Sequence, residues 1–355
     1  MTFEQARALF PVLDRIAYLN AGTFGPLSRG TLDAVRTELA RDLEEGRSGQ
    51  AYWDRATAMR KELAAQLASL LGVEPEQVAL TSSTTDGCNI VLAGLDLQPE
   101  DEIVTTTDEH FGLLGPLHAS RARIVVAPPD PDAIVAAVTL RARLLAISHV
   151  LWTTGQIMPV RELRERSRLP ILVDGAQAAG VIPVDATGLD FYTVSGQKWL
   201  RGPDNTGGLI VADHERLRIA RPSTFAQLRF DPDGAFEPRP GAERFQPNWL
   251  PVASLAGLTT ALGETPDWAY ERATAQAERL RELLAGQVEL TEPRERATLV
   301  SFRPPRGEDP VALVERLAAA GVVVRDLPGR GLVRASVGWW TSDDDLERLV
   351  AGIVG

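Results

Sequence analysis

The stretch from Ile171 to Trp199 constrains this chain more than any other, because it places an acid and an amine at the ends of two neighbouring strands. Its sequence is ILVDGAQAAGVIPVDATGLDFYTVSGQKW. The apolar runs at 171–173 and 191–194 are short and rich in β-branched residues, which is typical of buried parallel strands. Asp174 ends the first run, and Lys198 follows the second. Ligand sites of open α/β sheets lie at the carboxyl edge, so we predict that both side chains line one site.

An amine beside a carboxylate at a sheet edge suits pyridoxal phosphate chemistry. A lysine can hold this cofactor as a Schiff base, and a carboxylate can keep the pyridine nitrogen protonated so that the ring accepts electrons. From this stretch alone, a structural salt bridge between Asp174 and Lys198 is the alternative, since charged pairs are often structural.

The motifs VDGAQAAG and SGQKW resemble those of the class V aminotransferase family of fold-type I pyridoxal phosphate enzymes. This family includes cysteine desulfurases and isopenicillin N epimerase-like proteins. The resemblance implies that Lys198 forms the Schiff base and that Asp174 faces the ring nitrogen. It also implies that Gln177 donates a hydrogen bond to the ring hydroxyl, and that Ser195 and Gln197 contact the phosphate.

The resemblance also implies a fold and an assembly. We expect a large pyridoxal phosphate-binding domain over residues 18–260, with a mostly parallel seven-stranded sheet covered by helices. Residues 1–17 and 261–355 are expected to form a smaller α/β domain. Members of this family form homodimers, so a homodimer is expected here.

The N-terminal half carries two further cofactor motifs. The hydroxyl-rich segment TSSTTDG follows the strand predicted at 78–80. Such a segment before a helix suits phosphate, although an ordinary helix cap is the alternative. The resemblance places Thr84 and Thr85 on the phosphate. It also implies that His110, which follows the strand predicted at 102–106, stacks on the cofactor face and takes part in proton transfer.

Four residues are predicted to face the amino-acid substrate. The resemblance implies that Asn20 and Ala21 line the pocket, where a plain turn is the alternative. Trp152 stands where the family has an asparagine, which favours a bulkier substrate unless the indole only covers the sheet edge. Arg334, in the segment RASVGWW, is expected to grip the substrate carboxylate through a two-pronged hydrogen bond; the alternative is a surface arginine.

Composition excludes several classes of function. The formal net charge of −11 argues against binding to nucleic acid or anionic membranes. No apolar run approaches a membrane span, and the N-terminus does not resemble an export signal. Cys88 is the only cysteine, so neither a disulfide framework nor a cysteine-rich metal site is expected, and no metal is predicted. We expect a cytoplasmic enzyme.

The segment 325–331, RDLPGRG, lacks the catalytic cysteine that desulfurases carry shortly before their substrate arginine. We therefore predict a carbon–sulfur lyase that eliminates a sulfur group from an amino acid, similar to hercynylcysteine sulfoxide lyases. An aminotransferase or an isopenicillin N epimerase-like epimerase is the alternative. A catalytically silent pyridoxal phosphate-binding protein is the alternative from another class.

Three predictions concern local structure. Residues 2–17 are expected to form a helix. The segment after Lys198 is expected to return as a strand that runs antiparallel at the sheet edge. Residues 221–250 show little periodicity and are expected to be irregular.

Overall fold

The protein has two lobes, and the larger one is built on a seven-stranded sheet. A computed structural model describes residues 1–355. The strand order is β2-β8-β7-β6-β5-β3-β4, and β8 runs opposite to the other six strands. The expected α/β fold with a mostly parallel seven-stranded sheet is confirmed. The strands are β2 (Val78–Thr81), β3 (Glu102–Thr106), β4 (Arg123–Ala127), β5 (Ala142–Ser148), β6 (Ile171–Asp174), β7 (Phe191–Ser195) and β8 (Gly207–Val211).

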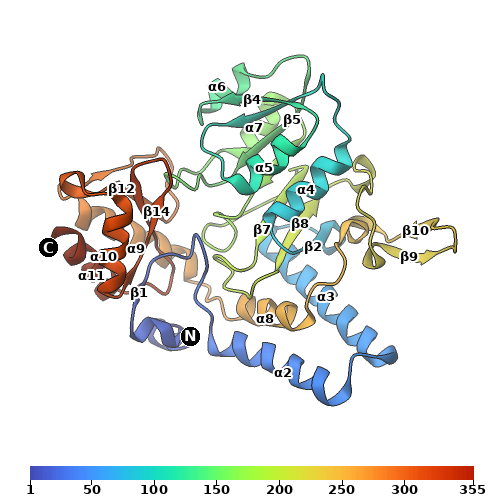
Figure 1. Cartoon of the computed structure of the whole chain (residues 1–355), viewed down its shortest axis with the longest axis horizontal. Coiled ribbons are helices and arrows are strands. Elements are labelled where there is room, and N and C mark those ends of the chain that lie inside the picture. Colours follow the sequence, from blue (N-terminus) through green and yellow to red (C-terminus); the bar gives the residue numbers. More distant parts are fainter.

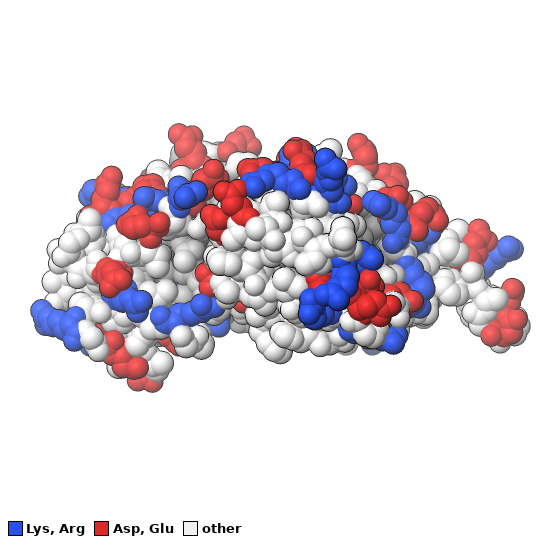
Figure 2. All heavy atoms as spheres, turned by 90° about the horizontal axis from the view of Figure 1, so that it is seen from above, with Lys and Arg blue, Asp and Glu red and all other residues white.

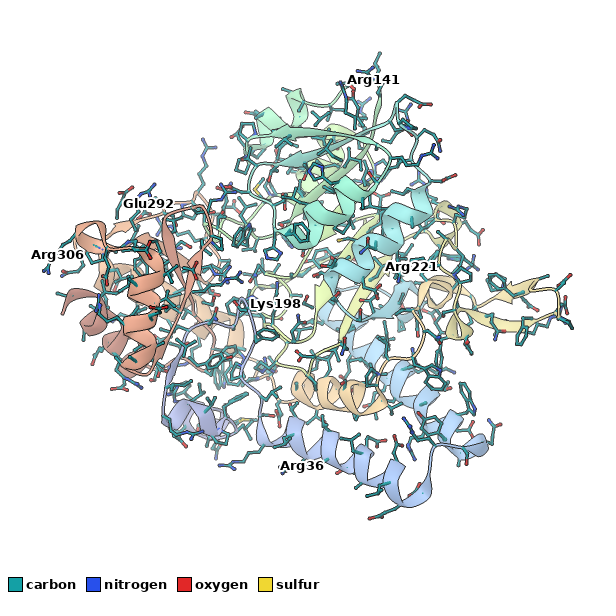
Figure 3. The ribbon with its side chains drawn as sticks, in the orientation of Figure 1. Arg36, Arg141, Lys198, Arg221, Glu292 and Arg306 are labelled. Carbon is teal, nitrogen blue, oxygen red and sulfur yellow. The ribbon has the colours of Figure 1, made fainter.

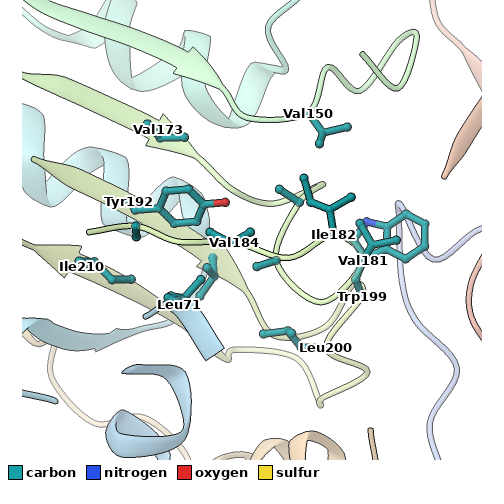
Figure 4. Close-up of a cluster of buried hydrophobic side chains, with 14 of the residues drawn as sticks. Leu71, Val150, Val173, Val181, Ile182, Val184, Tyr192, Trp199, Leu200 and Ile210 are labelled. Carbon is teal, nitrogen blue, oxygen red and sulfur yellow. The ribbon is translucent and has the colours of Figure 1, made fainter. Parts of the chain in front are cut away.

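Helices cover both faces of this sheet, so its strands are apolar on both sides (Figure 1). Neighbouring residues of one strand enter different hydrophobic clusters: Val173 belongs to one cluster and Leu172 to the other. Figure 4 shows Val173, Tyr192 and Ile210 in the first cluster, on the same side as Leu71. The helices of this lobe are α2 (Arg29–Glu45), α3 (Gly49–Leu71), α4 (Thr84–Leu95), α5 (Phe111–Ala119), α6 (Pro131–Ala136), α7 (Val160–Ser167) and α8 (Val252–Gly263).

The small lobe carries a four-stranded antiparallel sheet in the order β11-β12-β15-β14. Its strands are β11 (Glu289–Leu290), β12 (Leu299–Arg303), β14 (Arg325–Leu327) and β15 (Leu332–Ser336), and its helices are α9 (Ala269–Leu284), α10 (Pro310–Ala319) and α11 (Asp343–Val354). The N-terminal strand β1 (Ala17–Tyr18) joins this lobe by pairing in parallel with β13 (Val322–Val323). We keep 18–260, with 1–17 and 261–355, as the proposed domain division.

Three local predictions need correction. The expected helix at 2–17 is only α1 (Phe3–Arg7) and a 3₁₀ turn (Pro11–Asp14), because proline lacks the N–H that a continuing helix needs. Strand β8 is antiparallel as expected but does not lie at the edge, because β2 pairs with its outer side. The segment 221–250 contains a hairpin of β9 (Gln227–Phe230) and β10 (Phe236–Pro238), whose turn uses Gly234 at φ +92°.

The surface carries charges of both signs. On the face shown in Figure 2, acidic and basic side chains are intermixed around white areas. No helix combines the length and apolar character that crossing a membrane would require.

Candidate active site

A cavity opens at the carboxyl edge of the large sheet, where the chain leaves β6 and β7. These two strands are parallel neighbours, so residues that follow them in the sequence meet at one edge. Figure 3 shows Lys198 near the middle of the molecule, between the two lobes, while Arg36, Arg141, Glu292 and Arg306 lie at the periphery. Nine of the predicted site residues line this cavity: Thr84, Thr85, His110, Trp152, Asp174, Gln177, Ser195, Gln197 and Lys198.

Asp174 is buried and Lys198 is partly buried, and the charge of each shifts the pKa of the other. Burial lowers the pKa of the Lys198 amine to about 8, while the nearby charge of Asp174 works in the opposite direction. Burial raises the pKa of Asp174, while Lys198 and the backbone N–H of Ala176 lower it. The Ala176 N–H donates to Asp174 Oδ1 at 2.8 Å and fixes that carboxyl group. A near-neutral pKa lets a substantial fraction of the lysine act as a free amine, which a nucleophile requires.

The N-terminus of α4 and two hydroxyl groups form a site suited to an anion. Ser83 caps the helix by accepting a hydrogen bond from the Asp86 N–H at 3.1 Å. Thr84 Oγ1 lies 3.1 Å from Ser195 Oγ, which joins the start of the helix to the end of β7. Backbone N–H groups at a helix start attract negative charge, and the hydroxyl groups add donors. This donor set fits a phosphate group.

The amides of Gln177 and Gln197 differ in how much of their hydrogen-bonding capacity the protein uses. Gln177 Nε2 donates to the carbonyl of Gly22 at 2.8 Å, and its Oε1 accepts from the indole of Trp199 at 2.9 Å. An amide nitrogen carries two N–H groups, so one remains for a ligand. Gln197 Oε1 is buried and has no hydrogen-bond partner in the protein, so it is available to a ligand.

His110 is held as a neutral ring. Its Nδ1 accepts the backbone N–H of Gly112 at 3.0 Å at the start of α5, so the remaining proton of the neutral ring lies on Nε2. Burial, and then the charge of Lys198, lowers the pKa of His110 to about 4. The ring meets Trp152 edge to face, with centroids 5.2 Å apart. The imidazole is therefore a flat, uncharged group that can stack on an aromatic ligand.

Glu109, for which the sequence motifs predicted no role, holds the His110 segment against the sheet. Its carboxyl group accepts hydrogen bonds from the Thr106 hydroxyl and from the backbone N–H and hydroxyl of Ser148. Burial raises the pKa of Glu109 to about 7 although these donors lower it. The sequence signal was an acid directly before a histidine, just after a strand.

Arg334 lies on β15 at the side of the small lobe and is fully buried. Its Nη1 donates to the carbonyl of Trp152 at 2.8 Å, while Nε and Nη2 have no partner. Burial, together with the charge of Arg325, lowers the pKa of Arg334 to about 9. Two unpaired guanidinium nitrogens form the fork that a carboxylate fits. Because the side chain is covered, a ligand reaches it only if the covering groups shift.

The N-terminal loop is one of those covering groups. Asn20 lies next to Ser336 of β15 in a parallel bridge and accepts a hydrogen bond from the Thr23 hydroxyl at 2.9 Å. Ala21 is buried. A Cβ atom added to Gly22 would stand 2.6 Å from Arg334 Nη2, so only glycine allows this close approach. The loop thus contacts the arginine, while neither Asn20 nor Ala21 is among the residues that line the cavity.

Cys88 is a free, buried cysteine that packs against the large sheet. Burial raises the pKa of its thiol well above the usual value, so the thiolate that reacts as a nucleophile is disfavoured. No group of three or more His, Cys, Asp and Glu residues is placed to hold a metal ion.

The residues present fit pyridoxal phosphate. The cradle at Thr84 and Ser195 suits the phosphate, the neutral ring of His110 offers a stacking face, and Asp174 offers a charge partner for the ring nitrogen. Lys198 shares the same cavity and supplies the amine. The orphaned oxygen of Gln197 is a further polar group without a partner in the protein.

Comparisons with known proteins identify the family of the chain. The family model described as aminotransferase class-V matches residues 18–349. Isopenicillin N epimerase from Streptomyces clavuligerus is 29% identical over 392 aligned positions, which cover 98% of this chain and 96% of that protein. A probable cysteine desulfurase from Xylella fastidiosa strain 9a5c is 28% identical, with 99% and 95% covered. The solved complex of the cystine C–S lyase C-DES with cysteine persulfide has a TM-score of 0.88 at 26% identity, with 97% and 99% covered.

Proposed function

The chain belongs to the aminotransferase class-V family of pyridoxal phosphate-dependent enzymes, and from this premise we propose that it is a carbon–sulfur lyase. The proposed substrate is an amino acid with a sulfur-bearing side chain, of the kind that hercynylcysteine sulfoxide lyases cleave. The observation that carries the proposal is a cavity that joins Lys198 and Asp174, next to a β14–β15 hairpin without a cysteine. The structural likeness to a cystine C–S lyase supports it.

Each residue of the site has a task in such a reaction. Lys198 would hold the cofactor aldehyde and then, as a free amine, remove the proton from the substrate Cα. Asp174 would hold the ring nitrogen in its protonated form, and Arg334 would fix the α-carboxylate. Bound pyridoxal phosphate supplies an electron sink for the electron pair left at Cα. Thr84, Ser195 and the start of α4 would anchor the phosphate.

The bond changes of β-elimination balance without an external oxidant or reductant. The Cα–H and Cβ–S bonds break, and the sulfur group leaves with the electron pair of the Cβ–S bond. One water molecule then replaces the nitrogen, so the products are pyruvate, ammonium and a thiol, or a sulfenic acid when the substrate is a sulfoxide. No residue of the β14–β15 hairpin can accept the sulfur covalently as a persulfide, since Cys88 lies buried elsewhere.

The test is to load the purified protein with pyridoxal phosphate and to supply S-substituted cysteines and their sulfoxides. Pyruvate and ammonium should form in equal amounts with the released sulfur compound. Amino transfer to a keto acid without pyruvate would replace the lyase by an aminotransferase. Exchange of the Cα proton with loss of optical activity would replace the lyase proposal by an epimerase. The likeness to isopenicillin N epimerase supports that alternative.

A catalytically silent binding protein would behave differently in one respect. It would bind the cofactor and show the visible absorbance of a lysine adduct. That absorbance would not shift when amino acids are added. A shift with any amino acid therefore contradicts the silent alternative before products are assayed.

We also propose that the chain works as a homodimer. Leu32, Leu39 and Leu43 are exposed on α2 at spacings of seven and four residues, which places them on one face of the helix. Trp53 and Trp249 are half exposed in an aromatic group nearby in the same lobe, with ring centroids 5.2 Å apart. Sedimentation of the purified protein at twice the monomer mass of 38.5 kDa tests the dimer. A cytoplasmic location stays a prediction.

A further inference from the structure

Two arginines stand opposite each other on strands of the small lobe, close to Trp152, which lines the cavity. Arg325 of β14 pairs in register with Arg334 of β15. Residues directly opposite on an antiparallel pair point to the same face, with Cβ atoms about 4.5–5.5 Å apart, and like charges there are destabilising. The protein therefore concentrates two positive charges where its own strand pairing disfavours them.

Neither charge is balanced by an acid of the protein. No carboxylate oxygen lies within 4.0 Å of either guanidinium group, although 28 other salt bridges are formed in the chain. The neighbouring Asp326 pairs with Val333 and, by strand alternation, points to the opposite face. Asp108, the acid near the hairpin, is already paired with Arg330 at 3.0 Å.

Arg325 is half-buried and is held by neutral groups only. Its Nη1 donates to the Thr23 hydroxyl at 3.2 Å, and that hydroxyl in turn donates to Asn20. Its guanidinium carbon lies 6.0 Å from the centroid of the Trp152 ring, at the outer limit of a cation–π contact. One neutral hydrogen bond and one distant ring leave most of its five N–H donors without a partner.

Trp152 adds a third unused donor on this side of the cavity. Its indole Nε1 is buried without a partner, although indole N–H groups are usually satisfied when buried. Arg334 and Trp152 thus bring buried donors without a protein acceptor to this side of the site, and Arg325 adds a charge that no acid balances. One α-carboxylate has two oxygens and occupies the fork of Arg334, so a second acceptor is needed for Arg325.

We propose that the substrate of this site carries a second anionic group at the end of its side chain, and that Arg325 binds it while Arg334 holds the α-carboxylate. The inference rests on the proposed function for the position of the amino acid in the cavity. It narrows the substrate class to sulfur-bearing amino acids with an acidic side-chain end. Arg325 is then a specificity-determining residue.

The probe is a matched pair of amino acids that differ by one charge. S-carboxymethyl-L-cysteine and S-carbamoylmethyl-L-cysteine have nearly the same size and the same Cβ–S bond, but only the first has a second carboxylate. For the unaltered holoenzyme we expect kcat/KM, measured by pyruvate formation, to be about 10- to 100-fold higher for the carboxymethyl compound, the effect of one charge-assisted hydrogen bond.

Variants separate the role of Arg325 from a general loss of structure. Arg325→Gln should reduce the ratio of the two kcat/KM values to near one, and Arg325→Lys should restore part of it. Arg303→Gln is the matched control, because Arg303 is an exposed residue of β12 in the same sheet that already pairs with Glu289. It should leave the ratio unchanged. The visible absorbance of the bound cofactor should be the same in all four proteins.

Three outcomes decide the matter. Equal kcat/KM values for the two compounds in the unaltered enzyme would overturn the inference while leaving the lyase proposal standing. An equal loss with both compounds in Arg325→Gln would also overturn it, because Arg325 would then act on the shared α-carboxylate. If neither compound gives pyruvate but the carboxymethyl compound shifts the cofactor absorbance at about 10-fold lower concentration, the lyase proposal fails and the second-anion inference stands.

Discussion

The two sides of the candidate site differ in how many of their hydrogen-bonding groups have partners within the protein. We define the cofactor wall as Thr84, Asp174, Ser195 and Lys198. The protein itself fixes three of these side chains: the Thr84 hydroxyl contacts that of Ser195, and the Ala176 N–H donates to Asp174. The substrate wall, defined as Trp152, Arg325 and Arg334, contains buried donors with no partner. A preorganised cofactor wall suits a resident group, whereas an unsatisfied substrate wall suits a ligand that comes and goes.

The difference has a structural origin. The cofactor wall comes from strand and helix ends of one sheet, whose register is set by backbone hydrogen bonds. The substrate wall is assembled from β14 and β15 of the small lobe together with Trp152 of the large lobe. Changes in the cofactor wall should therefore alter cofactor binding and turnover together, while changes in the substrate wall should alter substrate affinity and leave the cofactor in place.

Among changes in the cofactor wall, Lys198→Ala should have the largest effect. We expect turnover to fall by about 10²–10⁴-fold or more, because the variant loses the group that moves the Cα proton and holds the cofactor. Borohydride treatment should attach the cofactor permanently to the unaltered protein and not to the variant, as judged by mass spectrometry. Permanent labelling of both proteins would contradict the role given to Lys198.

Glu109→Gln tests the residue that holds the His110 segment next to the cofactor wall. Because burial raises the pKa of Glu109 from 4.5 to about 7, the folded state favours the protonated form. Its contribution to stability is complete below about pH 4.5 and is lost as the pH rises to 7, by about 3 kcal/mol. The difference in the free energy of unfolding between variant and parent should therefore change across this pH range in favour of the variant. A difference that is constant with pH would contradict this.

Arg334→Gln tests the substrate wall. It removes the charge of the fork and should lower kcat/KM by about 10- to 100-fold, which corresponds to the loss of one charge-assisted hydrogen bond. The absorbance of the bound cofactor should stay unchanged, unlike in Lys198→Ala. A variant that loses the cofactor as well would show that the two walls are not independent.

Gly22→Ala gives the smallest expected effect. The new Cβ would stand 2.6 Å from Arg334 Nη2 and 2.9 Å from Ser336 Oγ, so the guanidinium must move by a few tenths of an ångström. Since a misplacement of 1 Å costs about 100-fold in rate, we expect about a tenfold fall in kcat/KM. Gly263→Ala is the control, because nothing lies within 4 Å of a Cβ atom there and its φ is not positive. Equal effects of the two substitutions would contradict the argument.

The same contrast explains what the sequence allowed us to predict. Motifs at strand ends locate the cofactor wall, because a parallel sheet brings consecutive strand ends together. Lys198, Asp174 and Thr84 therefore meet in one cavity, as their order along the chain predicts. Arg325 was missed since an arginine on a short strand has no local pattern. Its importance lies in its register with Arg334 and in the absence of an acid around both.

Local misreadings have equally physical causes. The prediction of a helix at 2–17 did not take into account that Pro11 interrupts a helix that has already begun. The expected edge position of β8 could not be judged from its own residues, because the strand that covers it, β2, lies more than 120 residues earlier in the chain. Such pairings depend on tertiary contacts rather than on local propensity.

The hairpin that carries Arg325 touches the large lobe at its tip, where Arg330 pairs with Asp108 and donates to the carbonyl of Thr107 at 2.9 Å. This contact is partly exposed to solvent, and exposed ion pairs contribute only about 0–1 kcal/mol. Because this contact is weak, moving the hairpin away from the large lobe costs little free energy. Such a movement matters because Arg334 is covered and a ligand reaches it only when the covering groups shift. Since dissolved salt screens exposed pairs, this contact between the hairpin and the large lobe should weaken as ionic strength increases.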